Sequence, residues 1–137
     1  MRLLIALLIS EPRYRKLSWR AAFLFYGAIL VIGSIPGARA DVGELASGFS
    51  LHMSAYSILA LLLFCGVQGS AWSRACKSIL MIAVMGALDE CVQSFFPYRS
   101  ADVMDWLVDM NAGLLISAML WAAWPKGASG KHSGPVA

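Results

Sequence analysis

AAFLFYGAILVIGSIPGA, residues 21–38, is a stretch of the chain that contains no charged side chain. The apolar segment to which it belongs extends from about Leu17 to Pro36. A helix that crosses a membrane needs about 20 mostly apolar residues, because it must cover ~30 Å of hydrocarbon at about 1.5 Å per residue. The segment therefore predicts a transmembrane helix.

Three more segments of similar length and character follow this one. They run from about Ser50 to Gln68, from Ser78 to Phe96 and from Val103 to Trp124. Only short connections separate them, so we expect the helices to pack as one unit. The predicted fold is an all-α, four-helix transmembrane bundle without room for a separate soluble domain.

The chain divides into three parts around this bundle. Residues 18–124 form the predicted transmembrane domain. Residues 1–17 are expected to be a cytoplasmic or interfacial segment, because the apolar run from Leu3 to Ile9 is too short to span and no signal-peptide cleavage pattern follows it. Residues 125–137, rich in Gly, Ser and Lys, are expected to be a flexible cytoplasmic tail.

The composition excludes several classes of protein. Of 137 residues, 59% are hydrophobic and 14% are charged, whereas soluble domains average about 25% charged residues. This excludes a cytosolic enzyme and a disordered chain. The net charge of +3 comes without a basic run, which predicts no nucleic-acid partner. The three cysteines have no paired spacing, so we predict no disulfide framework and no zinc site. The sequence contains no metal-cluster or nucleotide-loop motif, so we expect no metal and no cofactor.

The basic residues fall mainly on one side of the predicted bundle. Nine of them precede the first span, separate the second from the third, or follow the fourth: Arg2, Arg13, Arg15, Lys16, Arg20, Arg74, Lys77, Lys126 and Lys131. Only Arg39 and Arg99 fall on the other side. Because basic residues favour the cytoplasmic side of a membrane, both termini are predicted to be cytoplasmic.

The acidic residues have the opposite distribution. Seven of the eight fall in the outer loops or outer halves of the spans: Asp41, Glu44, Asp89, Glu90, Asp102, Asp105 and Asp109. Asp89 comes seven residues before Phe96, which places it about 10 Å below the outer surface. An ionisable group at this depth costs about 2.5–3.5 kcal/mol, so it must face protein or water.

Helical spacing brings polar groups from several spans to this outer level. On the third span, Gln93 lies one turn beyond Asp89 and Glu90. The other polar groups there are His52 and Tyr56, four positions apart, then Asp102, Asp105 and Asp109 on one stripe, and Arg99 in the loop between the acidic helices. We therefore predict one polar site at the outer end of the bundle.

This constellation resembles the VanZ-like family of small bacterial membrane proteins. The family's string D-E-x-x-Q-x-x-x-P-x-R matches residues 89–99, and its other motif positions match His52 and Tyr56, then Asp105, Asp109 and Gly113. The resemblance covers about residues 18–124. The chain departs from the pattern ahead of His52, where Gly48 and Phe49 stand in place of an Asp-Lys pair.

The resemblance implies a bacterial cytoplasmic (inner) membrane protein of the cell envelope. The distribution of basic residues predicts that its site faces the extracytoplasmic side. One member of the family is associated with resistance to the glycopeptide teicoplanin, which implies a link to antibiotic resistance. The resemblance implies a fold more than a reaction, so enzymatic activity stays open.

The candidate site residues divide into two groups by their chemistry. His52, Asp89, Glu90 and Asp105 are the candidates for general acid–base catalysis. Tyr56, Gln93, Arg99 and Asp109 are the candidates for substrate contact, with Arg99 suited to a phosphate or carboxylate.

Structural alternatives apply to several of these residues. Asp102 could only cap the fourth span. Asp89 and Glu90 could form an ion pair with Arg99 or hydrogen bonds with His52 and Tyr56. Gln93 could link two helices.

Three functions fit these observations. The first is an enzyme that acts on a lipid-linked or cell-envelope substrate, and the second is an accessory protein that binds such a molecule without chemistry. The third, a small proton-coupled carrier, is disfavoured because residues 57–64 and 78–88 contain few polar groups. The expected partners are membrane lipids and the lipid-linked or envelope substrate, and the oligomeric state is left open.

Overall fold

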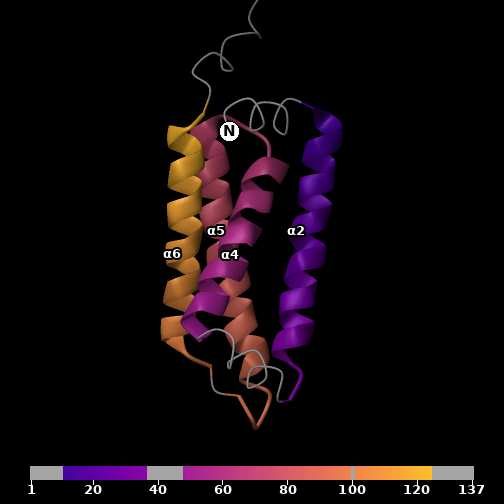
Figure 1. The fold of residues 1–137 in the computed structure, drawn as a ribbon, viewed down its shortest axis with the longest axis vertical. Helices are drawn as coiled ribbons and strands as arrows, with labels where there is room; N and C mark the ends of the chain where they lie inside the picture. Colours follow the sequence, from indigo (N-terminus) through magenta and orange to yellow (C-terminus); the bar gives the residue numbers. More distant parts are fainter. Residues whose placement is uncertain (1–10, 37–47, 100, 125–137) are drawn as a thin grey trace, which may run out of the picture.

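The computed structural model describes residues 11–36, 48–99 and 101–124, which form four helices (Figure 1). These are α2 (Pro12–Gly33), α4 (Gly48–Gly66), α5 (Ala71–Gln93) and α6 (Val103–Ala122). Helices α2 and α5 run in one direction and α4 and α6 in the other. The predicted all-α fold of four helices is confirmed, and the described segments contain no strand. The expected N-terminal interfacial run, the C-terminal tail, Asp41 and Glu44 lie outside the described residues.

Three of the helices, α2, α4 and α6, are long and apolar enough to cross a membrane. Helix α5 has 23 residues, which is as long, but it carries charged side chains near both ends. Of these, Arg74, Asp89 and Glu90 are buried inside the bundle. Helix α5 packs along α6 and α4 (Figure 1). These three charges therefore face protein, whereas Lys77, near the start of α5, is exposed. Helix α5 packs into the bundle as its fourth helix.

Helix α2 begins at Pro12, before the start at Leu17 that hydropathy predicts. Proline suits the first turn of a helix, because the N–H that it lacks would have no partner there. The early turns carry Arg13, Arg15 and Lys16. A span predicted from hydropathy leaves these charged residues out, although they are helical.

Helix α5 runs from Ala71 to Gln93, whereas the sequence predicted a span from about Ser78 to Phe96. Tight turns follow, in which the Phe96 N–H donates to the Gln93 carbonyl and the Arg99 N–H to the Phe96 carbonyl. The Tyr98 hydroxyl donates to the carbonyl oxygen of Ser34 at 2.6 Å. The loop between α5 and α6 is thereby tied to the end of α2.

Much of the core of the bundle is apolar, and so is much of its outer surface. Leu59, Leu63 and Ile82 have no exposed surface. On the outside, Leu24 and Leu80 are 76% and 65% exposed. An exposed apolar surface of this kind suits the hydrocarbon of a membrane.

Gly66 allows α2 and α4 to cross closely. A Cβ atom at this position would lie 2.9 Å from the backbone N and Cα atoms of Trp19. Backbone atoms cannot move aside as a flexible side chain can, so only glycine fits here. The two helices are therefore joined at the end opposite the predicted site.

Candidate functional site

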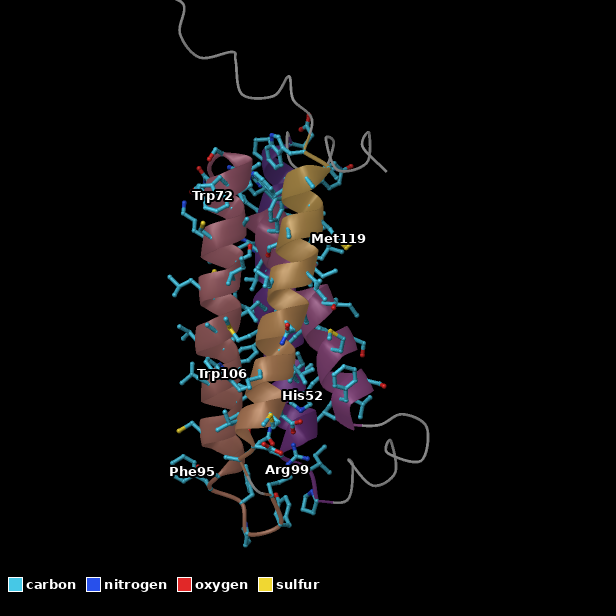
Figure 2. The ribbon with its side chains drawn as sticks, turned by 90° about the vertical axis from the view of Figure 1, so that its left-hand side faces the viewer. His52, Trp72, Phe95, Arg99, Trp106 and Met119 are labelled. Carbon is cyan, nitrogen blue, oxygen red and sulfur yellow. The ribbon has the colours of Figure 1, made fainter. Side chains whose placement is uncertain are left out.

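The predicted site residues converge at the end of the bundle where α2 and α5 end and α4 and α6 begin. Figure 2 shows His52 and Arg99 towards this end and Trp72 towards the other. Helix α4 supplies His52 and Tyr56, α5 supplies Asp89, Glu90 and Gln93, the following loop supplies Arg99, and α6 supplies Asp105 and Asp109. The candidates named from the sequence therefore lie in one region.

His52 lies between two carboxylates of α6. Its Nδ1 atom is 2.9 Å from Oδ1 of Asp109, and its Nε2 atom is 3.6 Å from Oδ2 of Asp105. The two aspartates are one helical turn apart and share a face. When Asp109 is ionised, the Nδ1–H of His52 donates to it. Because the Asp109 side chain is fully buried, this bond holds the imidazole in one orientation.

Tyr56 links α4 to α5. Its hydroxyl donates to Oδ2 of Asp89 at 3.3 Å, and both residues are buried. The rings of Tyr56 and His52 are stacked with their centroids 6.1 Å apart. The hydrogen-bonded alternative for Asp89 is therefore what the structure contains.

Glu90 bonds to the start of α6. Its Oε2 atom accepts a hydrogen bond from the backbone N–H of Asp102 at 2.6 Å, while its Oε1 atom is buried without a hydrogen-bond partner. Asp102 itself caps α6, since its side chain accepts from the Met104 N–H at 2.8 Å. The capping role considered for Asp102 is confirmed.

Arg99 bonds to an amide and not to a carboxylate. Its guanidinium donates to Oε1 of Gln93 at 2.6 Å. Its Nε atom is buried without a hydrogen-bond partner. The ion pair considered as an alternative, between Arg99 and Asp89 or Glu90, is absent from the described residues.

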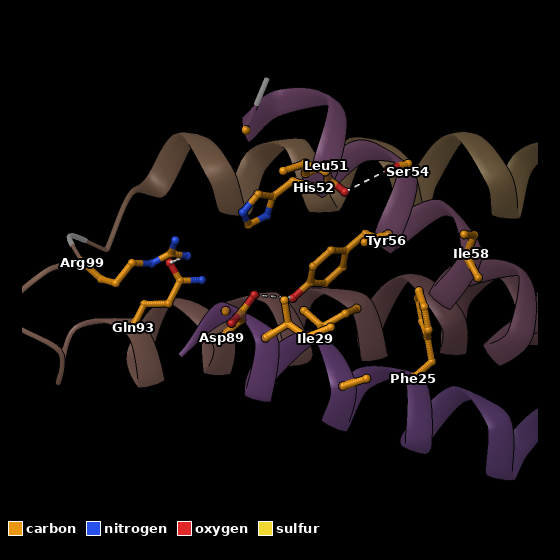
Figure 3. Close-up of a pocket in the computed structure, with 15 residues that line it drawn as sticks. Phe25, Ile29, Leu51, His52, Ser54, Tyr56, Ile58, Asp89, Gln93 and Arg99 are labelled. Carbon is orange, nitrogen blue, oxygen red and sulfur yellow. Dashed lines mark hydrogen bonds between the residues drawn. The ribbon is translucent and has the colours of Figure 1, made fainter. Parts of the chain in front are cut away.

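A cavity of about 340 Å³ adjoins these groups between α2 and α4 (Figure 3). Its walls are apolar along both helices, with Phe25 and Ile29 on α2 and Leu51 and Ile58 on α4. At one end it is lined by polar groups from His52, Tyr56, Asp89, Gln93 and Arg99. The cavity therefore has an apolar part and reaches part of the predicted polar site.

The sequence matches the family model of VanZ/LLP1 over residues 14–124, which is most of the chain. The chain belongs to the VanZ/LLP1 family. This confirms the resemblance inferred from its motif residues, and it supports a membrane protein. No curated protein and no solved structure matches the chain.

Two features of this VanZ/LLP1 site were missed by reasoning from the sequence. Trp106 donates its Nε1–H to the Ala83 carbonyl at 3.0 Å. A Cβ atom on Gly86 would lie 3.0 Å from both Trp106 Cδ1 and Asp109 Oδ2. Gly86 thus lets α6 bring Asp109 close to α5. A glycine within the acidic helix was the available signal for this contact.

The apolar walls of the VanZ/LLP1 cavity were also missed. Phe25, Ile29 and Ile32 are spaced four and three residues apart on α2. This spacing puts them on one face, but any membrane helix offers such apolar faces to lipid. Nothing in the sequence distinguishes a cavity wall from a lipid-facing surface.

Proposed function

We propose that this VanZ/LLP1 protein binds a lipid-linked molecule of the bacterial cell envelope. The observation that carries the proposal is the cavity between α2 and α4, which has apolar walls and a polar end. A lipid has the same two parts, an acyl or prenyl chain and a polar head group. The cavity volume of about 340 Å³ lies within the range of small-molecule sites, which is about 300–1,000 Å³.

The apolar part of the cavity suits a hydrocarbon chain. Phe25 and Ile29 face it from α2, and Leu51 and Ile58 face it from α4 (Figure 3). These side chains cannot orient a ligand by hydrogen bonds. They therefore support binding of an aliphatic chain. The polar end of the cavity would then select between ligands by their head groups.

The polar end suits an anionic head group. Arg99 supplies a guanidinium whose Nε–H has no partner, and its fork of donors matches the oxygens of a phosphate or carboxylate. Gln93, which accepts from Arg99, retains its amide N–H groups for further bonds. Tyr56, Asp89 and His52 complete the lining. Substrate contact is therefore proposed for Tyr56, Gln93 and Arg99, and Asp109 acts by positioning His52.

We place this site on the extracytoplasmic side of the cytoplasmic membrane, on the basis of the distribution of basic residues. A molecule bound there would be a lipid-linked component of the outer leaflet. Glycopeptide antibiotics act on cell-envelope precursors, so such binding would connect the protein to the resistance that the family name suggests.

Catalysis is the second candidate, and the His52–Asp109 pair favours it. A buried carboxylate bonded to Nδ1 fixes the imidazole tautomer and leaves Nε2 for proton transfer. Asp105, at 3.6 Å from Nε2, with Asp89 and Glu90, would supply further acid–base groups. An accessory role without chemistry requires only the binding site.

Photocrosslinking tests the binding proposal. The full chain is placed in bilayers that contain a phospholipid with a diazirine in its acyl chain, irradiated and digested. We expect labelled peptides to concentrate on residues 25–33 and 51–58. Equal labelling of the exposed faces of α5 and α6 would show that lipid only surrounds the protein, and it would contradict the proposal.

A further inference from the structure

We propose that His52, Glu90 and Asp105 bind a divalent metal cation. One ring nitrogen of His52 and one carboxylate oxygen from each of the two acids lie within 4.8 Å of one another. The three residues come from three different helices, α4, α5 and α6. An ion at this position would join the helices at the polar end of the bundle. The sequence alone predicted no metal, because its three cysteines have no paired spacing.

The geometry of His52 is the first support for this site. A metal-binding histidine usually uses one ring nitrogen for the ion and donates the other to a carboxylate, which fixes the ring. Asp109 occupies Nδ1 at 2.9 Å, so Nε2 is the nitrogen left for an ion. Nε2 lies 3.6 Å from Oδ2 of Asp105. When two ligand atoms bind one ion, each at about 2.1 Å, they lie about 3.0–3.4 Å apart from each other. Nε2 of His52 and Oδ2 of Asp105 would therefore need to move only slightly closer together to bind the same ion.

Glu90 provides a second and independent observation. The residue is 8% exposed, and its Oε1 atom is buried without a hydrogen-bond partner. Its other oxygen accepts from the Asp102 N–H at 2.6 Å, which fixes the carboxylate in place. A buried carboxylate oxygen without a partner is costly, and a cation satisfies it.

The charge of the region agrees with a bound cation. Asp89, Glu90 and Asp109 are buried, and Asp105 lies beside them with its side chain 15% exposed. The guanidinium of Arg99 donates to the neutral amide of Gln93. A divalent ion next to these carboxylates would offset negative charge at a depth where it is expensive.

The mixed ligand set indicates the class of metal. Carboxylates suit Mg²⁺, Ca²⁺ and Mn²⁺, and imidazole suits Zn²⁺ and other transition metals. A site with one imidazole and two carboxylates is therefore suited to Mn²⁺ or Zn²⁺. Mn²⁺ is the better probe, because the exposed thiols of Cys76 and Cys91 would compete for Zn²⁺.

The metal site is tested with the full chain in neutral detergent micelles, stripped with a chelator and titrated with Mn²⁺. Electron paramagnetic resonance counts the bound ions, because free Mn²⁺ has a sharp signal that weakens on binding. We expect one Mn²⁺ per chain, with a ¹⁴N modulation from the His52 imidazole in spin-echo spectra. This measurement on the unaltered protein does not depend on any variant folding.

Matched variants locate the ion. Glu90→Gln and Asp105→Asn keep the shape of each side chain and should weaken Mn²⁺ binding at least about tenfold. Asp109→Asn should weaken it about 10–100-fold, as loss of a carboxylate behind a histidine ligand does. Asp102→Asn is the control, because asparagine also caps a helix and Asp102 is outside the ligand set.

The outcomes separate this inference from the proposed lipid site. A bound Mn²⁺ without the ¹⁴N modulation, equal affinity in the native chain, Glu90→Gln and Asp105→Asn, or no binding at all would overturn it. Ala28→Trp, which fills the cavity lined by Ala28, should leave Mn²⁺ binding unchanged. The experiments can therefore confirm one of the two sites and contradict the other.

Discussion

The Nδ1 atom of His52 lies 2.9 Å from Oδ1 of Asp109, and this contact joins residues 57 positions apart in the chain. The Asp109 side chain has no exposed surface, while that of His52 retains 12%. The second oxygen of Asp109, Oδ2, is buried without a partner. The buried carboxylate of Asp109 is therefore stabilised mainly by its hydrogen bond to His52.

Removal of His52 alone should destabilise the protein more than removal of both partners. His52→Ala leaves a buried carboxylate without its partner, which costs about 3–5 kcal/mol. In His52→Ala/Asp109→Ala this penalty is gone. Unfolding in mixed micelles, with a chelator present to exclude metal effects, measures His52→Ala, Asp109→Ala and the double variant. Additive losses within about 0.5 kcal/mol would show that the pair is not coupled.

Gly66→Ala should destabilise the crossing of α2 and α4. The added Cβ would lie 2.9 Å from backbone atoms of Trp19, so the helices must separate, at a cost of about 1–3 kcal/mol. Gly27→Ala is the matched control in a helix, because a Cβ there has no atom within 4 Å. It should leave stability unchanged or raise it by up to about 1 kcal/mol. Equal unfolding free energies of the two variants would contradict the close crossing.

The sequence predicted the number and type of helices because apolar length alone sets them. The helix boundaries were predicted less accurately. Pro97 is a strong stop signal, yet α5 ends at Gln93, since the chain needs several residues to turn towards α6. Hydropathy also placed the start of α2 too late, because Arg13 and Lys16 are helical as well as charged.

The site was predicted as a group of residues but not as a geometry. Helix spacing puts Asp105 and Asp109 on one face, but it cannot say which helix that face meets. The bond from the Asp102 N–H to Glu90 and the place of Gly86 beside Asp109 depend on packing between helices. The same holds for the cavity between α2 and α4.

Arg99→Lys should weaken capture of an anionic lipid. Lysine keeps the charge but loses the planar fork of donors. A loss of one charge-assisted hydrogen bond, about 1.4 kcal/mol, corresponds to about tenfold weaker binding. Photocrosslinking yield against lipid concentration measures this, with Arg13→Lys at the opposite end of the bundle as the control. If lysine binds the lipid as well as arginine, Arg99 serves only to hold Gln93.

The distribution of basic residues predicts that both termini face the cytoplasm. A reporter enzyme that is active only outside the cytoplasm should be inactive when fused after Pro125. The same reporter inserted near Leu45 should be active. The reverse pattern would put the polar site on the cytoplasmic side and would remove the proposed access to the outer leaflet.

The proposed function requires that a lipid occupies the cavity between α2 and α4. Native mass spectrometry of the protein released from bilayers tests it most directly, by counting retained lipids in the native chain and two tryptophan variants. Both positions are exposed, but Ala28 lines the cavity, so Ala28→Trp should obstruct it. Ala118→Trp adds the same side chain on α6, away from the cavity. We expect one retained lipid for the native chain and for Ala118→Trp, and none for Ala28→Trp. Equal retention by the two variants would contradict it.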